Sequence, residues 1–189
     1  MRKQFQMKRF ITPIVALLFI FCTPALASLG EGDSEIGLDF GVMSFDSNTV
    51  DSSGTGFSLR GGYHFTDMFE LEGQFNRTTA EDDLGILGDM DITATTLFVN
   101  GVFNFHPRPN IVPYVLVGLG STGMEIEVLG VKVDDSSTAL QGGFGSRFFF
   151  GAEKKIALRV ELSFISEDTF GEDSTHTNFV GGLTWKLGS

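Results

Sequence analysis

The feature that most constrains the fold of this chain is a period of two residues that recurs in eight separate segments. In residues 57–65, for example, the odd positions hold Phe, Leu, Gly and Tyr, whereas the even positions hold Ser, Arg, Gly and His. Successive side chains of a strand point to opposite faces, so this pattern predicts strands with one apolar and one polar face. The eight predicted strands cover residues 35–42, 57–65, 69–76, 97–105, 112–120, 140–150, 156–164 and 177–187. The fifth is apolar on both faces, so its phase stays open.

Residues 1–27 have a different pattern, that of a secretory signal peptide. Basic residues open the segment, an apolar run follows over 14–21, and Ala25-Leu26-Ala27 offers a small-x-small cleavage site before Ser28. The run is shorter than the ~20 residues that a spanning helix needs, so a membrane anchor is disfavoured. We therefore expect a cleaved leader, 1–27, and one exported domain, 28–189.

Composition narrows the class of the exported domain. The leader holds four of the 13 basic residues and none of the 24 acidic ones, which leaves nine basic against 24 acidic residues. Such an acidic chain lacks the basic face that nucleic-acid binding requires. The single Cys lies in the leader, which excludes a disulfide framework. No later run of 18 apolar residues exists, so a chain that crosses a membrane must do so as a closed barrel.

The connections and the aromatic residues favour a membrane barrel. Short links at 66–68, 106–110 and 151–155 alternate with long acidic ones at 47–55, 77–91, 121–137 and 166–174. This layout is typical of outer-membrane barrels with both termini on the periplasmic side. Aromatic residues at the strand ends near the short links predict a single girdle of aromatic side chains at one membrane–water interface. Its members are Tyr63, Phe65, Phe69, Phe103, Phe105, Phe148, Phe150 and Trp185, with Tyr114 added if the fifth strand begins near Val112.

The alternative is a soluble eight-stranded, lipocalin-like barrel with its apolar face turned inward. The polar face here carries isolated charges among many glycines and lacks the continuous charged cover of a soluble surface. We therefore predict an all-β, eight-stranded, antiparallel, up-and-down transmembrane β-barrel.

Three motifs carry a resemblance to a known family. They are Pro113-Tyr-Val-Leu-Val-Gly-Leu-Gly120, Gln141-Gly-Gly-Phe-Gly145 and Gly182-Leu-Thr-Trp-Lys-Leu187. The chain resembles the small eight-stranded outer-membrane barrels, the OmpA/OmpX/opacity-like barrel domain. The resemblance implies the bacterial outer membrane, contact with lipopolysaccharide, and recognition of Gly182, Trp185 and Leu187 by the outer-membrane assembly machinery. The family usually ends on an aromatic residue, whereas here Leu187 is followed by Gly188 and Ser189.

The polar face predicts how the lumen is filled, since an eight-stranded barrel is just wide enough for its own side chains. We therefore expect a packed polar core. When the two strands on either side of each short link are aligned as a hairpin, His64 lies opposite Glu70 and Arg147 lies opposite Arg159. Two adjacent guanidinium groups require carboxylates, and the third strand lies across the ring from the seventh. The predicted interior ionic cluster, which plugs the lumen, consists of Arg60, Glu70, Glu72, Arg147, Arg159 and Glu161.

Catalytic and metal sites are only weakly indicated. His176-Thr177-Asn178 is similar to the His-Ser-Asn stretch of the lipid A deacylase family, but Thr replaces the nucleophilic Ser and no orienting carboxylate is evident. His64, His106 and His176 are too dispersed for a three-His site, and no acidic stretch matches a twelve-residue calcium loop. We expect no enzyme activity, no cofactor and no metal, and we interpret the acidic segments as a solvated rim.

Three functions remain open at this stage. The first is a structural or surface-interaction protein that displays acidic extracellular loops on a plugged barrel, its external ligand unidentified. The second is a narrow, gated, porin-like channel. The third is a lipid A-modifying enzyme.

Overall fold

Eight antiparallel strands make up the fold. The computed structural model describes residues 29–46, 51–83, 89–105, 110–128, 131–151, 153–169 and 172–187, and the predicted leader lies outside these ranges. The strands are β1 (Ser34–Asp46), β2 (Asp51–His64), β3 (Phe69–Asp83), β4 (Asp89–Asn104), β5 (Ile111–Val128), β6 (Val131–Phe150), β7 (Ile156–Thr169) and β8 (Glu172–Lys186).

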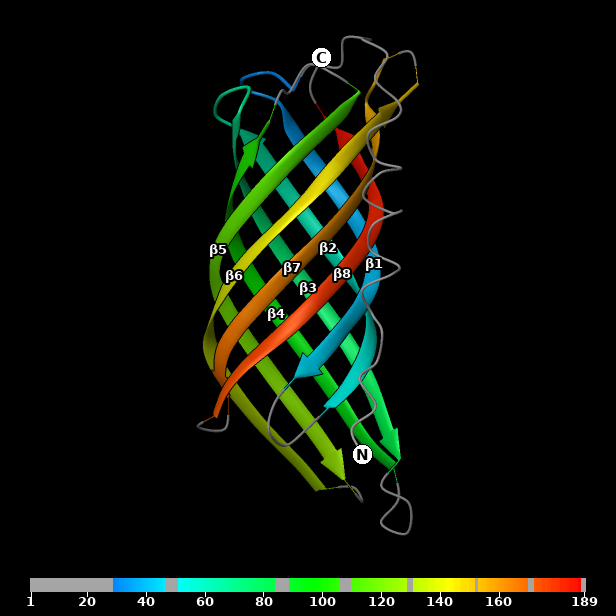
Figure 1. The fold of residues 1–189 in the computed structure, drawn as a ribbon, viewed down its shortest axis with the longest axis vertical. Coiled ribbons are helices and arrows are strands. Elements are labelled where there is room, and N and C mark those ends of the chain that lie inside the picture. The colour runs from blue at the N-terminus through cyan, green and yellow to red at the C-terminus, as the bar shows by residue number, and fades with distance from the viewer. Residues whose placement is uncertain are drawn as a thin grey trace, which may run out of the picture.

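Each strand pairs with its sequence neighbours, and β8 pairs with β1, so the sheet closes into a barrel (Figure 1). Following paired residues once around the ring from Ser34 leads to Ser44, a stagger of ten residues. Such a stagger requires strands that tilt against the barrel axis, as Figure 1 shows. The predicted fold class is confirmed. No helix among the described residues has the length and apolarity to cross a membrane.

The alternating pattern places apolar side chains outside and polar side chains inside. On β2, Leu59 is 50% exposed whereas its neighbour Arg60 is 5% exposed. The phase of the fifth strand, which the sequence left open, is now fixed: Tyr114 and Leu116 point inward, and Val117 is 70% exposed on the outside. An outer surface of this kind suits hydrocarbon rather than water.

The two ends of the barrel differ. We call the end where β1 begins and β8 ends the terminal end, and the opposite end the distal end; in Figure 1 the label C marks the terminal end. The long distal loops expected from the sequence are wrong in extent, because the strands continue through most of those segments. β5 reaches Val128 and β6 starts at Val131. In these distal extensions the strands pair through backbone hydrogen bonds, but their sequences do not alternate between apolar and polar residues. Alternation is lost because both faces of a hairpin outside the membrane can be polar.

The interior contains both polar and apolar side chains. Toward the terminal end it is ionic, whereas the distal half holds an apolar cluster. Its buried members are Met43, Ala80, Ile92, Ala94, Phe98, Ala139 and Ile165. The polar core expected from the sequence is therefore interrupted by apolar residues in the distal half. Small and apolar residues share the inward phase there with polar ones, and the search for charged partners passed over them.

Aromatic residues line the outside near the terminal end. Tyr63 contacts Phe65 edge to face, with ring centroids 5.0 Å apart, and Phe103 contacts Phe105 in the same way at 5.1 Å. Tyr114 is not part of this girdle, contrary to the expectation: it is 1% exposed and lies in the lumen. The double apolar character of the fifth strand had hidden its phase.

The residues before β1 cover the terminal opening. Leu29 is 1% exposed and packs with Val112, Phe149 and Ala157. The backbone N–H of Gly32 donates to the carbonyl of His64 at 2.9 Å, so the segment is held against the end of β2. Apolar side chains therefore cover the terminal opening, outside the ionic part of the interior.

Candidate functional site

An ionic network fills the lumen in the terminal half of the barrel. Its first centre is Arg60 on β2, which lies 2.5 Å from Asp39 on β1. The same guanidinium pairs with Glu72 at 3.0 Å and with Glu161 at 2.9 Å. Glu161 belongs to β7, on the far side of the ring from β3. One side chain thus joins four strands across the lumen.

The second centre is Arg159 on β7. It pairs with Glu72 at 2.5 Å and Glu161 at 2.9 Å, and its Nε donates to the hydroxyl of Tyr114 at 2.8 Å. The Tyr114 hydroxyl in turn donates to Glu161 at 2.7 Å. The ring also contacts two guanidinium groups, with the Cζ of Arg159 and of Arg147 at 4.8 and 4.9 Å from its centroid. Tyr114 therefore sits between two cations that the register places side by side.

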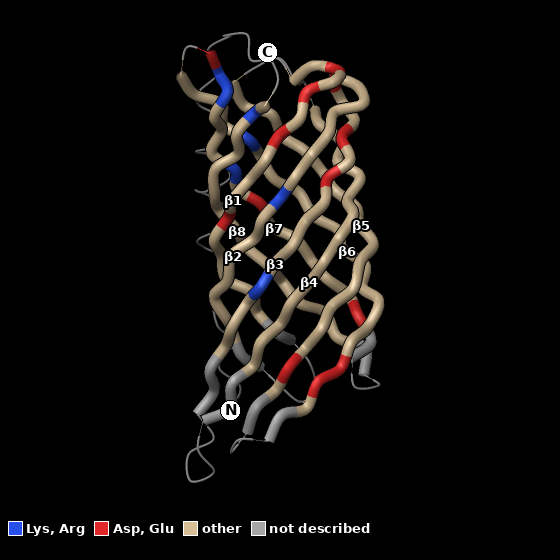
Figure 2. Tube along the Cα trace, turned by 180° about the vertical axis from the view of Figure 1, so that it is seen from behind, with Lys and Arg blue, Asp and Glu red and all other residues tan. Residues whose placement is uncertain are grey.

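The third centre is Arg147 on β6, which is fully buried. It pairs with Glu35 at 2.8 Å and with Glu70 at 2.7 Å, and it donates to the side-chain oxygen of Asn104 at 2.8 Å. Glu35 and Glu70 come from β1 and β3, so this centre also spans the ring. Figure 2 shows the basic residues gathered mainly in the barrel half that carries the label C.

Glycines make room for these side chains. A Cβ at Gly145 would collide with the Tyr114 hydroxyl, and a Cβ at Gly182 would collide with the Asp39 carboxylate. Both glycines face the lumen directly beside the network. These two glycines are therefore a steric requirement of large side chains that cross the barrel.

The structure brings all six predicted cluster residues into this one network. The two register predictions are confirmed, since His64 pairs with Glu70 and Arg147 with Arg159. Four further members were not in the predicted cluster: Glu35, Asp39, Tyr114 and His64. The alternation had already placed the two acids on the polar face, but closure of β1 against β2 and β8 was not used to find their partners.

Charge within the network does not balance. The described side chains include five carboxylates, from Glu35, Asp39, Glu70, Glu72 and Glu161. Only three guanidinium groups, from Arg60, Arg147 and Arg159, pair with them among the described residues. Buried charge requires compensation, so with all five carboxylates ionised the excess of two negative charges would be met by a bound cation or by protons.

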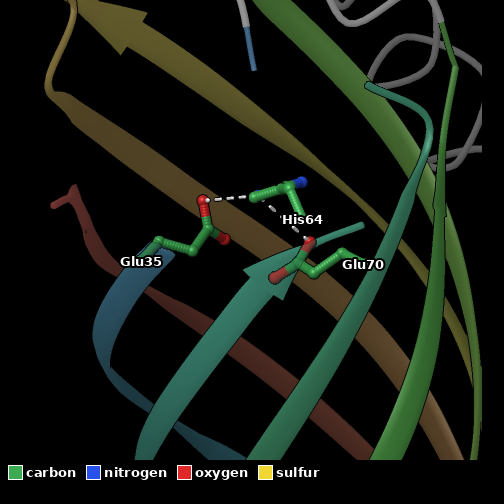
Figure 3. Close-up of side chains that lie close together, drawn as sticks. All are labelled: Glu35, His64 and Glu70. Carbon is green, nitrogen blue, oxygen red and sulfur yellow. Dashed lines mark ion pairs between the residues drawn. The ribbon is translucent and has the colours of Figure 1, made fainter. Parts of the chain in front are cut away.

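His64 is the remaining titratable member of the network. Figure 3 shows its ring between the Glu35 and Glu70 carboxylates. Nε2 lies 3.4 Å from Glu35 Oε2 and 3.7 Å from Glu70 Oε2. Neither ring nitrogen has a hydrogen-bond partner among the described residues, although His64 is 0% exposed.

The deacylase-like stretch is split by the strand. His176 points into the barrel, where its Nε2 lies 2.9 Å from Glu167 Oε1, whereas the neighbouring Thr177 points outward. The two side chains that would form a catalytic pair therefore lie on opposite faces of β8. His106, the third histidine considered from the sequence, lies outside the described residues.

A closed barrel with an apolar outside and an ionic inside defines the class of transmembrane β-barrels. The model of the family described as "Outer membrane protein beta-barrel domain" matches residues 14–186. The chain belongs to this family, which is one of outer-membrane proteins. No protein in the curated set matches the sequence significantly.

Solved structures share the fold at low sequence identity. Neisserial surface protein A matches with a TM-score of 0.71 and 12% identity, covering 83% of this chain and 100% of that one. The attachment invasion locus protein Ail of Yersinia pestis matches at 0.62 and 19%, covering 83% and 99%. OprG of Pseudomonas aeruginosa matches at 0.59 and 14%, covering 87% and 100%. At these identities the likeness supports the fold alone.

Proposed function

We propose that this protein is a plugged outer-membrane barrel with a structural or surface-interaction role, and that it does not serve as an open diffusion pore. The observation that carries the proposal is the set of ion pairs across the lumen, in which Arg60 reaches Glu161 and Arg159 reaches Glu72. Removing one partner of such a buried pair leaves an uncompensated charge. The network therefore favours a closed lumen over a gate.

The surface role is supported by the distal hairpins. Glu125 on β5 pairs in register with Asp134 on β6, and both are exposed. Adjacent carboxylates on a scaffold beyond an apolar belt suit recognition of cationic groups or of lipopolysaccharide phosphates bridged by divalent cations. We also propose that Gly182 and Trp185 of β8, with Leu187 directly after it, serve as the assembly signal; Leu187 is 61% exposed.

Planar-bilayer recording tests the closed lumen. The wild-type barrel should show no large, stable conductance, and Arg60→Ala should show frequent openings because it removes ion pairs to three strands. Arg77→Gln is the matched control: Arg77 lies on β3 but is exposed outside, so its replacement should leave the lumen closed. A large, steady conductance from the wild type would favour the channel function instead.

A further inference from the structure

We propose that Glu35, His64 and Glu70 bind a divalent transition-metal ion of the zinc class inside the terminal end of the barrel. Each residue offers one ligand atom, and the three atoms lie within 4.8 Å of one another. The residues come from β1, β2 and β3, so the site depends on closure of the sheet (Figure 3). This inference goes beyond the proposed function, since a plugged barrel needs no metal.

The spacing of the ligand atoms suits such an ion. Zinc binds imidazole nitrogen and carboxylate oxygen at about 2.0–2.2 Å in tetrahedral geometry, which places neighbouring ligand atoms about 3.4 Å apart. His64 Nε2 is 3.4 Å from Glu35 Oε2 and 3.7 Å from Glu70 Oε2. A small inward movement of Glu70 would therefore complete a three-ligand site.

Several polar atoms of the three residues lack a hydrogen-bond partner, although Glu70 Oε2 accepts from Arg147 and Asn104. Glu35 Oε2, Glu70 Oε1 and both His64 ring nitrogens are buried without a hydrogen-bond partner among the described residues. Leaving such polar atoms unsatisfied in a buried site is costly. A metal ion at the site would satisfy Glu35 Oε2 and His64 Nε2 at once.

Arg147 supports the site from outside. Its guanidinium pairs with Glu35 Oε1 at 2.8 Å and with Glu70 Oε2 at 2.7 Å, so Glu35 keeps Oε2 for an ion, whereas the Glu70 oxygen next to His64 is shared with the arginine. Ligating carboxylates are commonly oriented by such outer hydrogen bonds. The arginine therefore holds both carboxylates beside His64.

The charge count agrees with a doubly charged ion. Five carboxylates against three guanidinium groups leave the described network two negative charges in excess. One divalent cation compensates both. The imidazole nitrogen favours zinc, nickel or copper, since calcium and magnesium prefer all-oxygen ligands.

Zinc itself is the probe for the test. The barrel is refolded in detergent micelles with Zn²⁺ present, because the ligands are buried, and free metal is removed by gel filtration before metal analysis. The wild type should retain about one zinc per chain, and His64→Gln should lose it. His176→Gln is the matched control, since it replaces the other inward histidine, which faces Glu167 at the distal end, and it should retain the ion. Heat-modifiable gel mobility verifies that each variant is folded.

Glu35→Gln is the second variant, because it keeps the size of the side chain and removes one negative ligand. It should retain much less zinc than the wild type, and chelation should lower the melting temperature of the wild type but not that of His64→Gln. Wild-type protein without bound zinc, or His64→Gln with full occupancy, would overturn the proposal; protons would then supply the missing positive charge. Either result leaves the conductance test of the closed lumen unaffected.

Discussion

At the scale of single residues, Tyr114 holds the interior together. It donates to Glu161, accepts from Arg159 and lies between two guanidinium groups. Its position depends on the residue directly opposite in the register, Gly145, which has no side chain to occupy the same space. The packing of the polar network therefore depends on the Tyr114 ring and on the space that Gly145 leaves for it.

Replacing Gly145 with Ala should lower the free energy of unfolding by about 1–3 kcal/mol, the usual cost of overpacking. The new methyl group would collide with the Tyr114 hydroxyl and with the carbonyl of Val160. Gly142→Ala is the control on the same strand, because a Cβ there meets nothing within 4 Å. Urea unfolding from micelles measures both; equal losses in the two variants would contradict the steric role of Gly145.

At the scale of elements, the segment before β1 acts as a cover. Leu29 inserts between inward residues of β5, β6 and β7, and Asp33 pairs with Lys186 at 2.6 Å. The backbone N–H of His64 donates to the Asp33 carbonyl at 2.9 Å. The segment therefore closes the barrel next to the Glu35–His64–Glu70 cluster.

Leu29→Ala should lower the unfolding free energy by about 2 kcal/mol, since it leaves a cavity among apolar neighbours. It should also speed hydrogen exchange at the His64 amide, whose acceptor lies in the same segment. Glu31→Ala, at an exposed position two residues later, should change neither measurement. Unchanged exchange in Leu29→Ala would mean that the cover is held by its backbone alone.

The strands and their order could be predicted from the sequence because alternation reports burial on each face separately. Local hairpin pairing also found six of the network residues. Glu35 and Asp39 escaped because their partners are reached only when β1 closes against β2 and across the lumen. Tyr114 escaped because β5 is apolar on both faces, which removes the contrast that reveals phase. The full length of the distal strands was not predicted, because strands that pair beyond the apolar belt show no alternation of apolar and polar residues in the sequence.

At the scale of the whole molecule, the apolar belt positions the barrel in its bilayer. On the outer face of β5 it includes Val115, Val117 and Leu119, and it ends at Ser121. Lipid-facing charges are most costly near the midplane of a membrane. The outer face of β5 therefore offers one test position in the middle of the apolar belt and one at its edge.

Val117→Arg should destabilise the barrel in lipid vesicles by about 2–4 kcal/mol, whereas Ser121→Arg should cost about 0–1 kcal/mol. Both substitutions lie on the same face of the same strand, so the two introduced arginines differ in depth. Denaturant titration in vesicles of one lipid composition gives the comparison. Similar costs at the two positions would place the belt elsewhere along β5.

The apolar cluster in the distal half, around Met43, Phe98 and Ile165, has a consequence for conduction. Ala139 pairs in register with Glu167, and Ile165 pairs with His176, so the cluster lies at the level of the distal ion pair. A path opened in the arginine layer would still meet these apolar side chains before it reached the distal opening. The openings expected of Arg60→Ala should therefore be brief rather than steady.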